Sequence, residues 1–325
     1  MNYFVTGATG YIGAHLVKQL TSEGHTVHAL VRNSKKAQAI KNSLVELFEG
    51  DLMQPHTIDH AMHGCDYVFH LAAYAKVWAK ESKVFFDQNI KGTTHVLEAA
   101  IKNNVKRCVF TSTAGVLGPS FNEAVTEKSS RDLDFFNEYE SSKALSESKI
   151  KDYAIEGLDV VIVSPTRVYG PYLFGQSQSV TLLVEKFIKR NWRLVPGNGK
   201  KTGNYIFIDD VVQGHLAAME KGRKGHTYIL GGTNHNYLDF FDALKKVSGI
   251  ERSMIKTPLM VQLLFSQLQL INTWFGNEPL ITPKWINKGR YNWSVSPAKA
   301  VEELGLKMTP LDVGLKATID WIHSR

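Results

Sequence analysis

Cysteine is scarce in this sequence. The 325 residues contain only Cys65 and Cys108. A disulfide framework needs many more, so we expect two buried thiols beside core strands and a reducing compartment. A strand-like apolar run begins at residue 2 and leaves no room for a signal peptide. These absences predict a cytoplasmic protein.

Long hydrophobic runs and clustered metal ligands are also missing. No apolar stretch reaches the ~18 residues that a membrane-spanning helix needs. The 12 histidines are dispersed and none has metal-ligand spacing with a cysteine. The net charge of +7 comes from scattered lysines and arginines, whereas a nucleic-acid-binding protein gathers them on one face. We therefore expect no membrane span, no metal and no nucleic acid.

Short apolar strands alternate with helical segments along most of the chain. Such alternation predicts an α/β fold with a doubly wound, parallel, Rossmann-type sheet. Strands are expected near residues 2–6, 26–31, 44–49, 66–70, 105–111 and 159–164. Helices are expected near residues 11–23, 35–42, 55–62, 83–103, 137–156, 177–190 and 209–221.

The composition changes after about residue 171, where turn glycines and helix-breaking prolines become frequent. We expect residues 1–171 to form the dinucleotide-binding domain, with 204–225 returning to it. The remaining segments, 172–203 and 226–325, are expected to form a smaller, discontinuous C-terminal lobe that binds the substrate.

Three glycines follow the first predicted strand, at positions 7, 10 and 13. Gly7 allows a tight turn, Gly10 lets the backbone approach a pyrophosphate, and Gly13 lets the following helix pack on the strand. The N-terminus of that helix offers free N–H groups and a positive dipole end. The spacing differs from the more frequent G-x-G-x-x-G, so the strand–turn–helix context carries the prediction of a dinucleotide site.

Tyr139 and Lys143 stand four residues apart in a predicted helix, and so share one face of it. A lysine ammonium one turn away favours the phenolate and is expected to lower the tyrosine pKa. The pair then provides a general acid and base.

These two features resemble the extended short-chain dehydrogenase/reductase superfamily. Within it, the chain resembles the dihydroflavonol-4-reductase-like branch of the NAD-dependent epimerase/dehydratase family. The resemblance covers nearly the whole length, because further short motifs follow in the family's order. They are Gly50-Asp51-Leu52, His70-Leu71-Ala72-Ala73, Asn89 in N-x-x-G-T, Phe110-Thr-Ser-Thr113-Ala, Ser164-Pro165-Thr-Arg167-Val168-Tyr169-Gly170-Pro171 and Phe207-Ile-Asp209-Asp210-Val.

The resemblance implies a role for each matching residue. Tyr139 transfers a proton and Lys143 holds the nicotinamide ribose. Thr113 polarises the substrate carbonyl, with Ser112 able to share that role; Thr113 could instead only cap backbone. Cofactor contacts are implied for Gly7, Thr9, Gly10, Tyr11, Ile12, Gly13, Asp51, Leu52, Leu71, Ala72, Ala73, Asn89, Tyr139, Lys143, Pro165, Arg167 and Val168. A homodimer built from helices 83–103 and 137–156 is implied as well.

Arg32 stands at the end of the second predicted strand, where NAD enzymes often place an acidic residue. A cation there can pair with the 2′-phosphate of NADP, whereas a carboxylate would repel it. Arg32 could also only stack on the adenine or face water. We therefore expect NADP, with NAD possible.

Two activities fit these motifs. The first is reduction of a ketone or aldehyde. The second is epimerisation or dehydration of a nucleotide sugar with bound NAD. Gly203 replaces an arginine that binds the diphosphate in many nucleotide-sugar enzymes, and Arg167 replaces their asparagine. These differences favour the reductase, although Arg290 could supply a cation. A redox sensor without turnover would typically lack the tyrosine or the lysine.

The segment 259–271 is apolar at helical spacing, and Trp274 and Phe275 follow it. We expect this helix to pack on the core or to line a pocket for a hydrophobic carbonyl substrate. Peripheral membrane contact is the third alternative.

Overall fold

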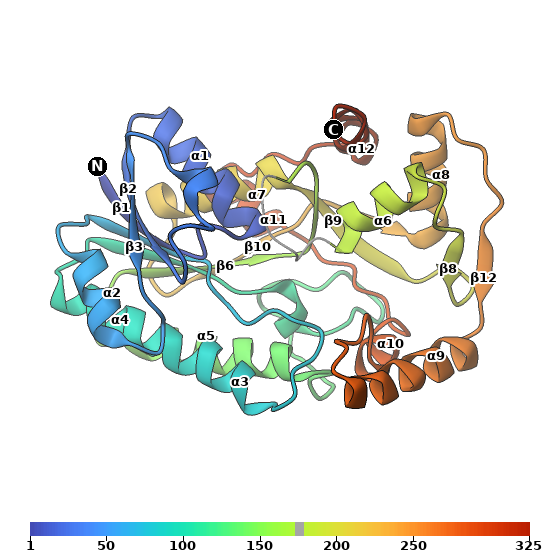
Figure 1. Ribbon diagram of the computed structural model, residues 1–325, viewed down its shortest axis with the longest axis horizontal. Coiled ribbons are helices and arrows are strands. Elements are labelled where there is room, and N and C mark those ends of the chain that lie inside the picture. The colour runs from blue at the N-terminus through green and yellow to red at the C-terminus, as the bar shows by residue number, and fades with distance from the viewer. Residues whose placement is uncertain (173–178) are drawn as a thin grey trace.

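A seven-stranded parallel sheet forms the centre of the molecule (Figure 1). The computed structural model describes residues 1–172 and 179–325. The strand order is β10-β6-β5-β4-β1-β2-β3, so the winding reverses between β1 and β4. The strands are β1 (Asn2–Thr6), β2 (Thr26–Val31), β3 (Val45–Glu49), β4 (Tyr67–His70), β5 (Arg107–Thr111), β6 (Val160–Pro165) and β10 (Thr227–Leu230). This arrangement confirms the predicted α/β, doubly wound fold.

Helices cover both faces of the sheet, which explains why the central strands are continuously apolar. Every residue of β6 is buried. One face packs against α1 (Tyr11–Ser22), α7 (Ile208–Lys221) and α11 (Ala298–Leu304). The other packs against α2 (Pro55–Met62), α4 (Gly92–Lys102) and α5 (Glu138–Ile155). Both cysteines are buried free thiols, as expected.

Two predicted helices differ in the structure. Residues 35–42 form only the short 3₁₀ helix η1 (Gln38–Ile40), because Ala37 and Ile40 alone are buried there and no apolar face can sustain a longer helix. Residues 83–103 form α3 (Lys83–Phe86), the π-helical turn η2 (Asp87–Lys91) and then α4. A π-turn inside a helix frequently marks a functional position, and this one contains Asn89.

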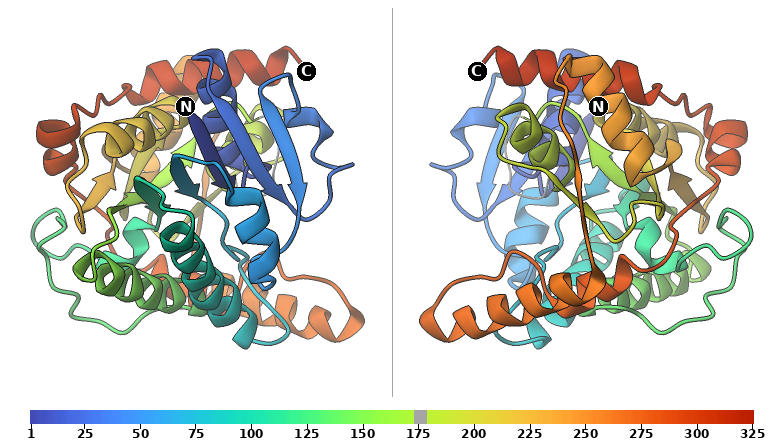
Figure 2. Two further views of the ribbon diagram at one scale, coloured as in Figure 1. Left: turned by 90° about the vertical axis from the view of Figure 1, so that its left-hand side faces the viewer. Right: turned by 90° about the vertical axis from the view of Figure 1, so that its right-hand side faces the viewer.

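The second region of the molecule holds two small sheets and several helices (Figure 2). One sheet joins β11 (Thr233–Asn236), β9 (Thr202–Phe207) and β7 (Arg167–Tyr169), and the other joins β12 (Ile255–Thr257) and β8 (Leu194–Pro196). Their helices are α6 (Ser179–Ile188), α8 (Tyr237–Ser248), α9 (Leu259–Ile271), η4 (Asn272–Phe275), α10 (Pro283–Lys288) and α12 (Leu311–His323). Positions 177 and 178 of the expected helix 177–190 lie outside the described residues.

The segment that returns to the large sheet is longer than expected. Helix α7 packs on the sheet, and β10 then pairs with β6 in parallel. Strand β10 begins at Thr227, beyond the end of the expected return at residue 225, and α11 adds a further contact from the C-terminal part. The division into a cofactor domain and a substrate lobe stays a prediction.

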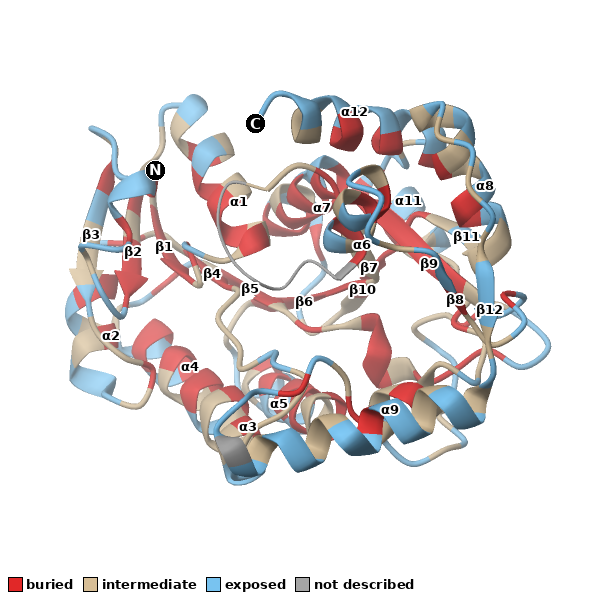
Figure 3. Ribbon diagram, turned by 45° about the vertical axis from the view of Figure 1, so that its right-hand side comes forward, coloured by how far each residue is buried: buried red, intermediate tan, exposed pale blue. Residues whose placement is uncertain are grey.

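Helix α9 leaves most of its apolar side chains exposed, so the expectation that they pack on the core is wrong for most of them, and the alternative that they line a substrate pocket stays a prediction. Met260 is 75% exposed, Leu264 65% and Leu268 52%. These residues repeat along the outer side of the helix, while the buried position is the small Ser266. Figure 3 shows this helix at the lower edge of the molecule with much of its surface exposed. No helix in the described ranges is long and apolar enough to cross a bilayer.

Candidate active site

The predicted site residues gather at the carboxyl edge of the large sheet. Gly7 follows β1, Ala72 follows β4 and Thr113 follows β5. In a doubly wound sheet, ligands bind in the crevice outside these strand ends, where the strand order reverses. Here that reversal lies between β1 and β4. The topology therefore brings the glycine turn and the candidate catalytic residues to one crevice.

The glycine turn has the geometry that its sequence predicts. Gly7 has a φ of +72°, and a Cβ there would lie 2.7 Å from the Ala72 nitrogen. A Cβ on Gly13 would lie 2.1 Å from the Gly7 carbonyl oxygen. Gly10 precedes α1 and no side chain caps the helix, so its first N–H groups are available to an anion. The turn therefore fits the pyrophosphate of a dinucleotide.

The three residues predicted around the glycines have different environments. Thr9 is exposed and Ile12 is half-buried. Tyr11 is buried, and its hydroxyl donates to the Gly170 carbonyl oxygen at 3.0 Å. Burial raises the Tyr11 pKa, which keeps the hydroxyl a donor. Tyr11 thus connects the turn to the end of β7, and its cofactor contact stays a prediction.

Tyr139 and Lys143 lie in the first two turns of α5, as predicted. The helix begins at a cap where Asn137 Oδ1 accepts the Glu140 N–H at 3.0 Å. Burial raises the Tyr139 pKa to about 12, and Glu140 adds to the rise. The expected lowering of this pKa by Lys143 is therefore wrong in this structure. The phenol stays protonated at neutral pH.

Lys143 is buried, and burial lowers its pKa to about 8, while Glu147 opposes the change. Glu147 lies one turn further along the helix and is also buried, which raises its own pKa. Within the described residues, the Lys143 ammonium makes no hydrogen bond. It is free to donate to a ribose hydroxyl.

Thr113 and Ser112 do not share one environment. Thr113 Oγ1 accepts the Gly115 N–H at 3.2 Å, which fixes the side chain but leaves its O–H free to donate. The capping role and the catalytic role are therefore compatible. The Ser112 hydroxyl is buried and has no hydrogen-bond partner among the described residues, although its proximity to Glu147 lowers the pKa of that carboxyl. Its role as a second catalytic hydroxyl stays a prediction.

Asn89 links the site to its supporting helices. Its Oδ1 accepts the Tyr74 N–H at 2.7 Å, and its Nδ2 donates to Ser142 Oγ at 2.9 Å. Ser146 Oγ donates to the Asn89 carbonyl oxygen at 2.7 Å. The side chain is thus used within the protein, and it fixes the segment after β4 against α5. A direct contact of Asn89 with the cofactor stays a prediction.

The remaining predicted cofactor residues lie around the same crevice. Arg32 is exposed directly after β2, and Asp51 Oδ1 accepts the Met53 N–H at 2.8 Å after β3. Leu52 is buried where a Cβ on Gly92 would approach it to 3.0 Å, so it packs on α4. Leu71, Ala72, Ala73 and Val168 are half-buried, whereas Pro165 is buried at the end of β6.

A buried ion cluster next to Tyr139 was not predicted. The two Glu140 carboxylate oxygens pair with Arg131 at 3.1 Å and with Lys288 at 2.7 Å. The Glu140 side chain is 1% exposed. Lys288 comes from α10, so the cluster joins the catalytic helix to the C-terminal part of the chain. No sequence pattern predicts that residues 140 and 288 pair, because they are far apart along the chain and meet only in the folded protein.

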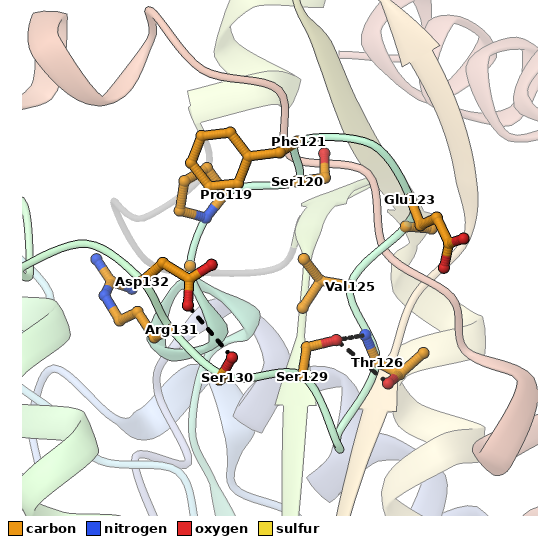
Figure 4. Close-up of a pocket in the computed structure, with 12 residues that line it drawn as sticks. Pro119, Ser120, Phe121, Glu123, Val125, Thr126, Ser129, Ser130, Arg131 and Asp132 are labelled. Carbon is orange, nitrogen blue, oxygen red and sulfur yellow. Dashed lines mark hydrogen bonds between the residues drawn. The ribbon is translucent and has the colours of Figure 1, made fainter.

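The loop between η3 (Ala114–Leu117) and α5 contains a hollow of the surface, drawn in Figure 4. It is lined by residues between Gly118 and Asp132, and short bonds such as Ser130 Oγ to Asp132 Oδ1 at 3.2 Å hold the loop. No residue of the glycine turn and neither Tyr139 nor Lys143 lines it. We therefore place the active site in the crevice and not in this hollow.

Comparison with known proteins agrees with this geometry. Residues 3–231 match the model of the NAD dependent epimerase/dehydratase family. The chain belongs to this family.

Members of the family differ in activity. A Synechocystis sp. protein named after dihydroflavonol 4-reductase is 28% identical over 99% of this chain and 94% of its own length. Sterol demethylase protein B of Methylococcus capsulatus is 29% identical over 100% of this chain and 99% of its own. UDP-glucose 4-epimerase of Thermotoga maritima, solved with UDP-glucose, has a TM-score of 0.82 and 26% identity, covering 100% of this chain and 99% of that one. Reductases and nucleotide-sugar enzymes are thus both represented among the similar proteins. The chain is an enzyme of the extended short-chain dehydrogenase/reductase type, a group that uses NAD(P).

Proposed function

We propose that this enzyme reduces a ketone or aldehyde with NADPH. One observation carries the proposal: Tyr139 lies one turn before Lys143 on α5, in the same crevice as the glycine turn and Thr113. Burial raises the Tyr139 pKa, which favours the protonated phenol. A protonated phenol is the group that a carbonyl reduction needs, because the alkoxide that forms must receive a proton. An epimerase needs the tyrosine first as a base.

NADPH, when bound, supplies the hydride. The chain's own residues do the rest. The glycine turn and the α1 N-terminus hold the pyrophosphate, and Lys143 donates to the nicotinamide ribose. Thr113, whose oxygen is oriented by the Gly115 N–H, donates a hydrogen bond to the substrate carbonyl oxygen and keeps its proton. Tyr139 transfers its proton to that oxygen.

NADPH is proposed over NADH on the position of Arg32. This side chain is exposed after β2, the strand end that faces an adenosine ribose in this fold. Its guanidinium can pair with a 2′-phosphate.

A nucleotide-sugar epimerase or dehydratase is the second candidate, and one observation favours it. A Cβ on Gly203 would lie 2.3 Å from the Arg167 guanidinium, so Arg167 occupies the space beside residue 203. Position 203 has no arginine, but the Arg167 guanidinium lies in the space that a side chain at position 203 would occupy. This finding weakens the argument from Gly203 and Arg167 against a diphosphate.

The cofactor retained after gentle purification, identified by mass, separates the two candidates. We expect an empty or loosely held site that takes up NADP. Tightly bound NAD, together with micromolar binding of a UDP- or dTDP-sugar in calorimetry, would replace the reductase by the epimerase.

We also propose a homodimer through α4 and α5. Both helices carry large apolar side chains at the surface: Ile101 and Leu145 are each 49% exposed and Ile155 is 85% exposed. A second copy of the same helices would cover them. Light scattering at micromolar concentration should give twice 36.4 kDa, and a mass of 36.4 kDa would reject the dimer.

A further inference from the structure

Two arginines near the site differ in how their donors are used. Every nitrogen of the Arg131 guanidinium donates a hydrogen bond within the protein. The acceptors are the carbonyl oxygens of Leu133 for Nε, of Gly115 and Val116 for Nη1, and the Asp134 carbonyl oxygen and the Glu140 carboxylate for Nη2. Arg167 uses only Nη1, which donates to Tyr205 Oη at 3.2 Å and to Tyr237 Oη at 3.5 Å. A guanidinium has five N–H donors. In the described part of the chain, most donors of Arg167 therefore lack an acceptor.

Arg167 also lacks an acidic partner. Among the described residues, no carboxylate lies within ion-pair distance of it. Residues 173–178, outside the described ranges, contain neither Asp nor Glu. The guanidinium lies over the rings of Tyr205 and Tyr237, at 5.5 and 5.6 Å, which offsets only part of its desolvation. Arg167 is half-buried, and its unused donors are not among the buried unpartnered atoms, so they are accessible to an anion that enters the crevice.

The backbone is shaped around this guanidinium. Any side chain at position 203 would collide with it, because a Cβ there would lie 2.3 Å from Nη1. Gly203 is not in a left-handed conformation, so the need for glycine comes from space alone. The position is thus built to accept the arginine.

Arg167 lies near Lys288, which in turn lies near Thr113. Burial lowers the Lys288 pKa, and the charge of Arg167 adds to that decrease. The Lys288 ammonium lies 3.3 Å from where a Cβ on Gly115 would be, and Thr113 Oγ1 lies 3.4 Å from the same point. Among the described residues, Arg131 and Lys288 pair with the Glu140 carboxylate, and Arg167 pairs with no carboxylate. The site has an excess of positive charge beside Thr113.

We propose that Arg167 binds an oxyanion, a carboxylate or a phosphate, carried by the carbonyl substrate. The flat face and the forked donors of a guanidinium suit two oxygens of such a group. The proposal rests on the proposed reductase activity and names its substrate class: an acidic carbonyl compound, not the wholly hydrophobic one that the apolar segment 259–271 suggested. Arg167 is then a specificity-determining residue.

A matched pair of substrates tests the proposal. NADPH oxidation is measured with 4-carboxybenzaldehyde and with its neutral methyl ester, in wild type, Arg167→Gln and the exposed control Arg193→Gln. We expect kcat/KM of the wild type to favour the acid, and Arg167→Gln to reduce that preference about 10- to 100-fold, as loss of a charged hydrogen bond does. Turnover of the ester should change little. Arg193→Gln should behave as the wild type.

Calorimetry keeps the outcome independent of turnover. Benzoate, phenyl phosphate and UDP are titrated into wild type and variants with saturating NADP, and the anion that binds identifies carboxylate, phosphate or diphosphate. If Arg167→Gln weakens the binding of an anion at least about tenfold, the result supports the subsite. If such binding is found but no aldehyde is reduced, the subsite stands and only the proposed reductase activity is rejected. Binding of none of the three, or equal binding to Arg167→Gln, overturns the subsite. Arg167→Lys keeps the positive charge but removes the forked donors of the guanidinium. Comparing it with Arg167→Gln separates a folding defect from the loss of the contact with the anion.

Discussion

The large sheet and the C-terminal part of the molecule cover their apolar side chains to different degrees. In the sheet, apolar residues are buried on both faces. Among its polar groups, the ring nitrogens of His70 lie 2.7 Å from Thr6 Oγ1 and 3.1 Å from Thr93 Oγ1. Burial lowers the His70 pKa to about 3, so this histidine stays neutral. In the other part, α9 exposes an apolar side and Arg167 lacks an anion. The large sheet thus buries its apolar surface within the molecule, whereas the C-terminal part leaves an apolar side of α9 exposed.

The largest expected effect comes from the catalytic proton. Tyr139→Phe should lower the rate of carbonyl reduction by about 10²–10⁴-fold, the usual loss when a positioned acid is removed. Cofactor affinity should change little, because the glycine turn and Lys143 provide those contacts. Stopped-flow turnover and cofactor titration measure both quantities. Activity within a few-fold of the wild type would remove Tyr139 from its role.

The ion cluster joins the two regions, and its removal should reveal that role. Glu140→Ala leaves Arg131 and Lys288 buried without their carboxylate, which should lower the free energy of unfolding by about 3 kcal/mol. The control Glu138→Ala removes a neighbouring carboxylate that pairs with the more exposed Lys284, and should cost about 1 kcal/mol or less. Chemical denaturation compares them. Equal losses would mean that the cluster is no stronger than a surface pair.

Cofactor choice gives the next effect. Arg32→Asp should shift the ratio of the NADPH and NADH dissociation constants toward NADH by about 10- to 100-fold, since a partner of the 2′-phosphate is replaced by a repelling charge. Fluorescence titration of both cofactors with both proteins gives the ratio. An unchanged ratio would show that Arg32 does not contact the 2′ position.

The smallest effect concerns stability and pH. The Lys143 pKa is about 8 in the folded protein, against 10.5 for the free side chain. Folding thus carries a penalty that is complete below about pH 8 and relieved between about pH 8 and 10.5. Lys143→Met should raise the free energy of unfolding at pH 7 by up to about 2 kcal/mol, with a gain that shrinks toward pH 10.5. Denaturation curves at several pH values measure it. A gain that grew with pH would contradict the buried ammonium.

The sequence predicts the large sheet and the glycine turn well, because their signals are local. Gly7 and Gly13 have the close approaches expected, and Tyr139 and Lys143 lie one turn apart on α5. The rest depends on contacts between distant segments. The tyrosine pKa follows from burial and not from the nearby lysine, and the pairing of Glu140 with Lys288 arises only when α10 folds against α5.

Helix α9 shows a second limit of sequence patterns. Its helical spacing of apolar residues is real, but periodicity cannot say which side of a helix faces the protein. Here Met260 and Leu264 face outward and Ser266 faces inward. Likewise, the sequence does not show that Arg167 and Gly203 are neighbours. In the structure, the Arg167 guanidinium fills the space that a side chain at position 203 would need.

Transfer of deuterium from 4-deuterated NADPH tests the central claim most directly. The enzyme is incubated with the labelled cofactor and 4-carboxybenzaldehyde or its methyl ester, and with UDP-glucose in a parallel reaction. The reductase predicts deuterium in the released alcohol, one equivalent of NADP formed per product, and no change of UDP-glucose. Epimerisation of UDP-glucose without net oxidation of the cofactor, and with no label in any alcohol, would contradict it.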